Sequence, residues 1–195
     1  MLARTLIAVA AVLALSFSTE RSQAQYYGRG TPYYSQSYSY GRPYTYGYSS
    51  VARSAVPVSR SYEPNTIIIS TSQRRLYYIT NNGQAISYGI GVGRAGFAWS
   101  GVTRVSAKRE WPSWTPPAQM RRRQPGLPSH MRGGIDNPLG ARALYLGSTL
   151  YRIHGSNEPH TIGQAVSSGC FRMTNEDVID LYNRVRVGTK VIVTQ

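Results

Sequence analysis

Short apolar runs separated by turn residues recur along the chain from about residue 66. A β-branched run at 66–70 is followed by apolar runs at 76–79 and 84–90. Residues 81–83 are Asn-Asn-Gly, and Asn and Gly tolerate the positive φ of a tight hairpin turn. These runs therefore predict three strands, the last two of which are joined by a hairpin.

Three further apolar runs lie towards the C-terminus. The runs at 143–146 and 150–154 flank a Gly-Ser pair at 147–148, which is typical of another hairpin, and a run at 190–194 closes the chain. Strands of this length, joined by tight turns, are typical of a mainly β fold. Most of the sheet is expected to be antiparallel.

One helix is predicted just after residue 173. Thr174 is a favourable N-cap, and Glu176 and Asp177 place negative charge in the first turn, where the helix dipole favours it. Apolar residues recur at helical spacing on one face of this segment: Val178, Leu181, Tyr182 and Val185. Gly188 follows near the expected end, so the apolar face is expected to pack on the sheet.

The region from Ser100 to Gly140 is expected to be irregular. Its many prolines break regular structure, and a connection of this length inside a compact domain is usually a functional loop or lid. Four arginines of this region are candidates to face carboxylates on a substrate: Arg121, Arg122, Arg123 and Arg132.

The beginning of the chain has the pattern of an export signal. Arg4 precedes an apolar run at 6–15, and small residues at 22 and 24 predict cleavage before Gln25. The apolar run is short for an uncleaved anchor helix, and no later stretch is apolar enough to span a membrane. We therefore interpret residues 1–24 as a signal peptide.

Residues 25–63 are expected to form a disordered linker before a domain at 64–195. Tyr, Ser, Gly, Arg, Pro and Gln dominate the segment, and aliphatic residues are too few to offset the entropy of ordering it. The segment is a plain spacer or, through its Tyr and Arg side chains, a surface that stacks on a sugar polymer.

The net charge of +14 narrows the class of partner. An exported basic protein meets acidic envelope polymers, and the sequence has no nucleic-acid-binding motif, so nucleic acid is not expected as a partner. The charge also serves solubility. Cys170 is the only cysteine, and a lone thiol in an oxidising compartment is either buried and inert or kept for its reactivity.

His154 and Cys170 carry the candidate chemistry. His154 ends a predicted strand, and Cys170 lies just before the predicted helix, so both ends of the intervening loop are expected side by side at one edge of the sheet. A thiol with the ordinary pKa of about 8.5 is mostly protonated at neutral pH. A nearby imidazole accepts its proton and returns it to a leaving amine, which predicts a cysteine nucleophile with a histidine base.

The residues around this pair suit attack on a carbonyl group. A glycine beside the sulfur leaves room for the substrate, nearby backbone N–H groups are candidates to bind an oxyanion, and an arginine adds positive charge. The supporting residues are Gly155, Ser167, Ser168, Gly169 and Arg172. A lone Cys is most often a core residue and a lone His a surface residue, so only their combination favours catalysis.

The stretch from His154 to Met173 resembles the catalytic motif of the L,D-transpeptidases, the YkuD domain. In that motif His-Gly-Ser/Thr is followed, after a loop, by Ser-x-Gly-Cys, an apolar residue and often Arg-Met or Arg-Leu. This chain has His154–Ser156 and Ser167–Met173 in the same order and at a similar spacing. The resemblance covers about 64–195 and implies an antiparallel β-sandwich with the active site at one end, under a lid.

The resemblance also implies a reaction. Cys170 would attack the carbonyl between diaminopimelate and the terminal D-Ala of a peptidoglycan stem tetrapeptide, and His154 would protonate the departing D-Ala. The thioester would pass to an amine of another stem peptide, giving a 3-3 cross-link, or to a protein such as an outer-membrane protein. Water would give a carboxypeptidase and a D-amino acid would give exchange. No cofactor and no metal are expected, and the place of action would be the periplasm or cell wall.

Other interpretations remain open. Many family members have His just before the Gly-Cys pair, where this chain has Ser168, so tuning of the site by that His is in doubt. A sortase also places His before Cys, but it carries Thr-Cys, and its Arg lies farther along. Papain-like peptidases place Cys before His. A non-catalytic wall-binding protein is the alternative from a different functional class.

Overall fold

The computed structural model describes residues 51–195, so the predicted signal peptide and residues 25–50 of the predicted linker lie outside it. The strands are β1 (Ser54–Pro57), β2 (Ile67–Ser70), β3 (Arg75–Ile79), β4 (Gln84–Gly89), β5 (Val92–Gly93), β6 (Gly101–Glu110), β7 (Arg142–Leu146), β8 (Arg152–His154), β9 (Ala165–Ser167), β10 (Phe171–Arg172) and β11 (Lys190–Thr194). The helices are α1 (Ala118–Arg123), the 3-10 helix η1 (Pro159–Thr161) and α2 (Asn175–Arg184).

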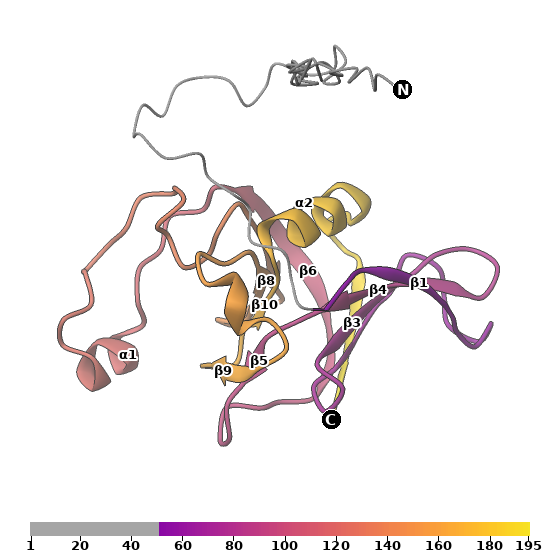
Figure 1. Ribbon diagram of the computed structural model, residues 1–195, viewed down its shortest axis with the longest axis horizontal. Coiled ribbons are helices and arrows are strands. Elements are labelled where there is room, and N and C mark those ends of the chain that lie inside the picture. Colours follow the sequence, from indigo (N-terminus) through magenta and orange to yellow (C-terminus); the bar gives the residue numbers. More distant parts are fainter. Residues whose placement is uncertain (1–50) are drawn as a thin grey trace, which may run out of the picture. The chain divides into compact units, whose positions relative to one another are not determined.

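Most of the described strands join one sheet in the order β1-β4-β3-β2-β11-β6-β7-β8-β10 (Figure 1). Neighbours are antiparallel except for the pairs β2–β11 and β8–β10, which are parallel. Strands β5 and β9 form a separate parallel pair. The mainly β, largely antiparallel architecture predicted from the sequence is therefore confirmed.

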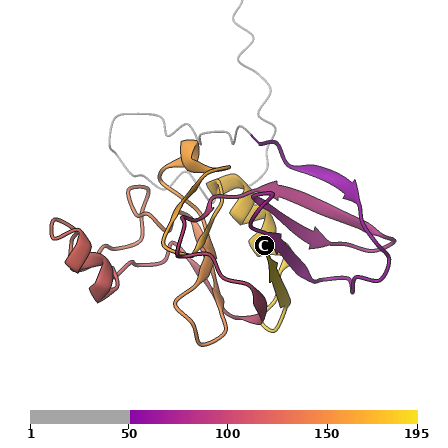
Figure 2. The ribbon, with the colours of Figure 1, turned by 90° about the horizontal axis from the view of Figure 1, so that it is seen from below.

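Strand β6 divides the large sheet into two halves. Its first residues, Gly101–Arg104, pair with β11, and its remaining residues, Val105–Glu110, pair with β7. The register shifts between Val105 and Ala107, and such a bulge bends a strand and increases its twist. The two halves of the sheet therefore lie at an angle to each other, as Figure 2 shows.

The two halves and α2 share one apolar core. Residues from β2 and β11 on one side, and from β7, β8 and β10 on the other, contribute fully buried side chains to it. Examples are Ile67, Ile69, Val191, Leu144, Ile153, Phe171 and, from α2, Val178 and Leu181. The helix packs on β7 and β8, the strands that lead into the candidate site.

Two local predictions are confirmed at the level of backbone geometry. The backbone N–H of Asp177 donates to Thr174 Oγ1 at 3.2 Å, so Thr174 is the N-cap of α2. In the β3–β4 turn, Asn82 and Gly83 have φ values of 62° and 70°, in the left-handed region that Asn and Gly tolerate.

The prediction that residues 100–140 are irregular was wrong for the first part of that region. Residues Gly101–Glu110 form β6, the longest described strand. Val105 is the buried apolar residue of this strand, and most of its other positions are partly or fully exposed. The apolar alternation that marks a half-buried strand is therefore missing from the sequence, and pairing with β11 and β7 defines the strand instead.

The predicted linker extended too far towards the C-terminus. Its last residues contain β1, which pairs with β4, and Arg53 forms an ion pair with Asp180 of α2 at 3.2 Å. In β1 only Val56 is partly buried, because the strand lies at the sheet edge and pairs through its backbone. Hydrophobic patterning could not reveal it.

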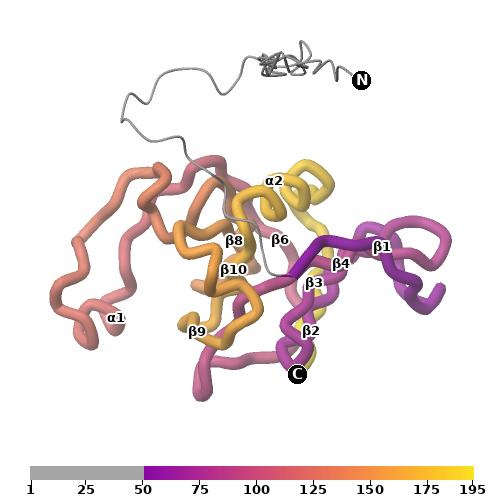
Figure 3. The backbone as a smooth tube through the Cα atoms, in the orientation of Figure 1, coloured from indigo at the N-terminus to yellow at the C-terminus, as the bar shows by residue number. Residues whose placement is uncertain are grey.

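The segment from Trp111 to Gly140 remains largely irregular, as expected. It carries α1 away from the sheet on the side opposite to β1, as the tube in Figure 3 shows. Trp114 and Met131 exchange two backbone hydrogen bonds of 2.8 Å each, which close the base of this excursion. None of the helices in residues 51–195 is long and apolar enough to cross a membrane.

Candidate active site

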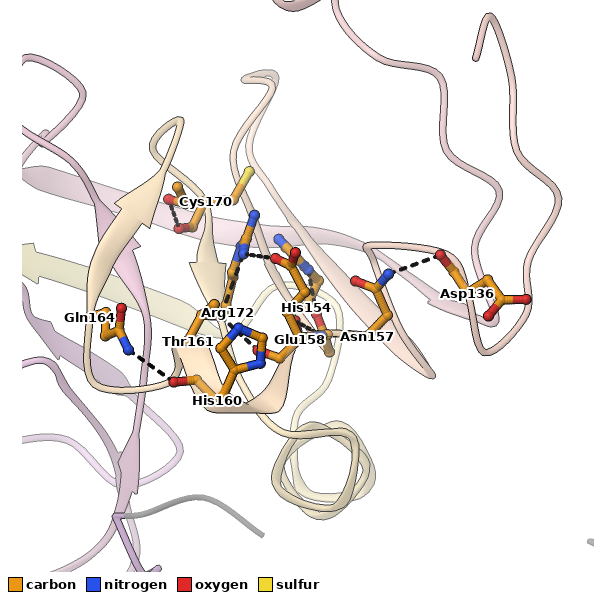
Figure 4. Close-up of polar contacts among 12 residues, drawn as sticks. Asp136, His154, Asn157, Glu158, His160, Thr161, Gln164, Cys170 and Arg172 are labelled. Carbon is orange, nitrogen blue, oxygen red and sulfur yellow. Dashed lines mark hydrogen bonds and ion pairs between the residues drawn. The ribbon is translucent and has the colours of Figure 1, made fainter. Parts of the chain in front are cut away.

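The parallel pair of β8 and β10 brings the two halves of the predicted motif together. Arg172 is paired with His154, and Phe171 is paired with Ile153. Ile153 and Phe171 are fully buried in the core, and side chains alternate between the faces of a strand. His154 and Arg172 therefore project from the opposite face, near Cys170 at the start of β10 (Figure 4).

The Cys170 thiol is partly buried and donates to the Leu150 carbonyl oxygen at 3.8 Å. Burial raises the pKa of Cys170, and the charges of Arg152 and Arg172 act in the opposite direction without outweighing it. The resting group is therefore the thiol. The positive charge of Arg172, which the sequence placed near the thiol, lowers the pKa of Cys170, but burial outweighs it.

The His154 imidazole is held by the backbone. It is 4% exposed, and its Nδ1 lies 2.6 Å from the carbonyl oxygen of Gly155. A carbonyl oxygen only accepts, so Nδ1 carries the proton, and Nε2 is left as the basic nitrogen. Burial, together with the charges of Arg172 and Arg152, lowers the pKa of His154 to about 3, so the ring is neutral near neutral pH.

Gly155 is constrained by close packing as well as by its contact with His154. A Cβ at this position would clash with Oδ1 of Asn175 and would lie 3.0 Å from the backbone nitrogen of Ala141. The Gly155 N–H also donates to the Arg142 carbonyl at 3.0 Å. These contacts fix the carbonyl that orients His154, so Gly155 is a positioning residue.

Ser167 organises the turn before the thiol. Its Oγ donates to the Cys170 carbonyl at 2.6 Å and accepts from the Gly169 N–H at 3.1 Å. Gly169 has a φ of +107°, and a Cβ there would lie 2.5 Å from Cε1 of Tyr151. Trp99 Nε1 donates to the Gly169 carbonyl at 3.2 Å, and its ring stacks on Tyr151.

The expected oxyanion donors need one correction. The Gly169 N–H is already bonded to Ser167 Oγ, so it is not free to bind an oxyanion in this conformation. Ser168 is not placed against the thiol by any contact in the described chain; it lines a neighbouring cavity instead.

That cavity has a volume of about 400 Å³ and is basic. Its lining includes Arg94, Arg123 of α1, and Arg172 of β10. Arg172 is paired with Glu158 at 2.8 Å, whereas the guanidinium carbons of Arg94 and Arg123 lie 4.6 and 5.1 Å from the Phe97 ring centroid. Within residues 51–195 neither Arg94 nor Arg123 forms an ion pair, so both keep their charge for a ligand.

Of the four arginines expected to face a substrate, only Arg123 lines this cavity. Several residues that shape the site were missed by sequence reasoning: Arg94, Phe97, Trp99, Tyr151 and Arg152. These residues lie in the loop after β5 and at or just before the start of β8. Only Arg152 had a signal in the sequence, its position two residues before His154. In residues 51–195 no three His, Cys, Asp or Glu side chains gather as metal ligands do.

No hydrogen bond joins the Cys170 thiol directly to the His154 ring in the described chain; the thiol is turned to Leu150 and the ring to Gly155. Hydrogen bonds between catalytic groups are often long or poorly aligned in a protein without substrate, so the missing contact does not argue against the pair. The arrangement can support nucleophilic attack by sulfur on a carbonyl, with a neutral imidazole as base.

Comparison with known proteins agrees with this chemistry. The family model of the YkuD L,D-transpeptidase catalytic domain matches residues 64–193, more than half of the chain. The chain belongs to this family. The probable L,D-transpeptidase ErfK/SrfK of Escherichia coli (strain K12) is 40% identical over 134 residues, which cover 64% of this chain and 42% of that protein. The chain thus matches less than half the length of this curated relative.

Two solved structures are similar to this chain. A Brucella melitensis protein, described as a probable carnitine operon oxidoreductase caia, is 45% identical, with a TM-score of 0.50 over 73% of this chain and 93% of that chain. The catalytic domain of an Enterococcus faecium L,D-transpeptidase, acylated by ertapenem, is 21% identical, with a TM-score of 0.51 over 66% and 95%. The second likeness supports the fold alone, and the YkuD fold expected from the sequence is confirmed.

Proposed function

We propose that this YkuD domain is an L,D-transpeptidase that acts on peptidoglycan stem tetrapeptides through Cys170. The observation that carries the proposal is the parallel β8–β10 pairing: β8 ends at the buried, neutral His154, and Cys170, the only cysteine of the chain, directly precedes β10. The family membership supports the same reaction class. The bond attacked is the amide between diaminopimelate and the terminal D-Ala.

In the first step the thiol proton moves to Nε2 of His154 as the sulfur attacks the scissile carbonyl. Burial disfavours both the thiolate and the imidazolium in the resting site, so proton transfer is expected together with substrate binding rather than before it. The Nδ1 contact with Gly155 keeps Nε2 in its accepting form.

In the second step the tetrahedral intermediate collapses to a thioester, and the imidazolium gives its proton to the departing D-Ala amine. An incoming amine then attacks the thioester, and His154 removes a proton from it. The acceptor is an amine of a second stem peptide in our proposal, with a protein amine or water as other outcomes. Turnover with water would make the domain an L,D-carboxypeptidase.

The basic cavity beside the site suits a carboxylate of the donor peptide. Stem peptides carry free carboxylates, and Arg94 and Arg123 present two guanidinium groups that the described residues do not neutralise. Stacking on Phe97 restricts both side chains, which lowers the entropy lost when they bind an anion. Because Arg123 comes from α1, the excursion that carries α1 would act as one wall of the substrate site.

Action on the cell wall requires export, which we propose from the signal-like pattern at 1–24 and from the basic charge of the chain. A non-catalytic wall-binding role is the second candidate considered from the sequence. No contact in the described site favours a wall-binding role. The Gly155 carbonyl orients the His154 ring, which is useful for proton transfer and has no use in adhesion.

The proposal is tested by turnover of a purified disaccharide-tetrapeptide, followed by mass spectrometry of the products. Wild-type protein should release D-Ala and form cross-linked or hydrolysed product, whereas Cys170→Ser should fold with an unchanged melting temperature and give only background release. Near-normal turnover by folded Cys170→Ser would overturn the assignment of the nucleophile.

The same assay compares substitutions of two neighbouring arginines. Arg123→Gln removes a charge that lines the cavity and should raise KM by about threefold or more, with a small effect on kcat. Arg122→Gln is the matched control, because it removes the same charge from a position of α1 that does not line the cavity. Equal effects of both substitutions would mean that the cavity does not bind the substrate.

A further inference from the structure

We propose that Arg152 stabilises the Cys170 thiolate during the reaction, as a second cation beside Arg172 that the motif resemblance does not assign. The proposal deepens the function proposed above, because it concerns the charge that develops on the same sulfur. It rests on the position of Arg152 in the β8–β10 pair and on the contacts of its guanidinium group.

Arg152 lies opposite Cys170 in the sheet. The parallel pairing sets Phe171 against Ile153, so the preceding residues, Cys170 and Arg152, are neighbours at the start of the two strands. Both side chains contact one carbonyl group: Nη1 of Arg152 donates to the Leu150 oxygen at 3.1 Å, and the Cys170 thiol donates to the same oxygen at 3.8 Å. The guanidinium and the sulfur are therefore held around one acceptor.

The guanidinium of Arg152 is fixed and has hydrogen-bonding capacity to spare. Its Cζ lies 5.0 Å from the centroid of the Tyr145 ring, which supports it from one face. Its Nε is buried without a hydrogen-bond partner, and leaving a buried donor unpaired is costly. A thiolate beside it would supply an acceptor and a compensating charge that the thiol does not supply.

The charges around the thiol support the same assignment. Arg152 from β8 and Arg172 from β10 both lower the pKa of the Cys170 thiol against the effect of burial, so both favour the thiolate. Arg172 is already paired with Glu158, whereas Arg152 forms no ion pair within the described residues. His154 is neutral, so it adds no charge until it accepts the proton.

The proton balance is simple. The thiol proton moves to Nε2 of His154, the electron pair stays on sulfur, and Arg152 keeps all its protons. The new negative charge is compensated by a cation already in place, and the same cation makes the imidazolium at His154 less favourable. Arg152 therefore favours the thiolate while keeping His154 a weak base that readily returns its proton to the leaving amine.

The test is the pH dependence of Cys170 alkylation by iodoacetamide in the full-length protein. Arg152→Gln should move the inflection of the rate to higher pH by about one unit or more, which corresponds to a loss of about tenfold or more in rate near neutral pH. Arg152→Lys keeps the charge and should stay close to wild type. Arg60→Gln is the matched control, because it removes the same charge from an exposed residue in the connection between β1 and β2, where the Arg60 side chain lies against Gly83.

An unchanged inflection in folded Arg152→Gln, with only a lower melting temperature, would show a structural role and overturn the proposal. An equal shift in Arg60→Gln would reduce the effect to net charge and overturn it too. If Arg152→Gln does not fold, Arg152→Lys is the deciding variant. A rise of a full pH unit in the inflection of its alkylation rate, despite the retained charge, would contradict the proposal. Alkylation needs no turnover, so failure here is distinguishable from a failure of the transpeptidase assignment.

Discussion

At the scale of single residues, the site depends on backbone groups as much as on side chains. The Gly155 carbonyl fixes the tautomer of His154, and Ser167 links the Cys170 carbonyl to the Gly169 N–H. Burial favours the neutral imidazole of His154 and the protonated thiol of Cys170. In our proposal, charge separation between the two follows only when substrate binds.

The burial of neutral His154 predicts a specific loss of stability in acid. The pKa of about 3 in the folded state lies below the unfolded value of about 6.5. The stabilising contribution is therefore fully present above about pH 6.5 and is lost as the pH falls towards 3. The free energy of unfolding of wild type should fall more steeply than that of His154→Gln across this range, by up to about 1.4 kcal/mol per pH unit.

His160→Gln provides the matched control for this experiment. His160 is exposed, and its backbone carbonyl accepts a hydrogen bond from Nε2 of Gln164. Chemical denaturation at a series of pH values should give the wild-type slope for this variant. Parallel slopes for wild type and His154→Gln would contradict the burial of a neutral ring at position 154.

Residues with a local signature are the ones for which the sequence allows a prediction. The N-cap Thr174, predicted from its place before an amphipathic segment, is confirmed. The roles of His154, Cys170 and their glycines follow from motif order and spacing, and they stay predictions. The Gly155 carbonyl as the group that orients His154, and the Trp99–Tyr151 stack, could not be predicted, because they depend on segments far apart in sequence meeting at the site. Every residue type carries a backbone carbonyl, so the sequence does not reveal which carbonyl accepts a given hydrogen bond.

At the scale of elements, two of the strands that were missed are held by pairing rather than by burial. Strand β6 joins the two halves of the sheet yet is largely exposed, and β1 lies at the sheet edge with one partly buried residue. Strands β2, β3 and β11 bury apolar side chains at alternate positions and were predicted to within one or two residues. Hydrophobic pattern alone therefore finds only strands that line the core.

Strand β1 predicts that stability is lost when the chain is shortened past residue 51. A chain that begins at residue 64 lacks the β1–β4 pairing, the Arg53–Asp180 ion pair and the contact of Val51 with Gly89. Its melting temperature should be lower by about 4 °C or more. A chain that begins at residue 51 keeps these contacts and should melt like the full-length protein.

Differential scanning calorimetry of the two shortened chains separates these outcomes. Equal melting temperatures for both would mean that β1 adds nothing to the fold, and that the domain begins at residue 64 as the sequence pattern suggested. A large loss already in the chain that begins at residue 51 would show that the residues before it contribute to stability.

At the scale of the whole molecule, the candidate site combines one half of the large sheet with two segments outside that sheet. The half that contains β8 and β10 supplies Cys170 and His154, while the loop after β5 supplies Arg94, and α1 supplies Arg123. The basic cavity suits the anionic peptide substrate that we propose. The family fold of residues 64–193 agrees with that function.

The most direct measurement of the central claim is the intact mass of the protein after incubation with ertapenem. A β-lactam carbonyl is a strained amide that a sulfur nucleophile opens, so the mass should rise by one inhibitor equivalent, with the adduct mapped to Cys170 by peptide mass spectrometry. The increase should be absent in Cys170→Ser and slower in His154→Ala, but unchanged in His160→Ala. A well-folded protein that gains no mass, or that carries the adduct away from Cys170, would contradict the assignment of Cys170 and His154 as nucleophile and base.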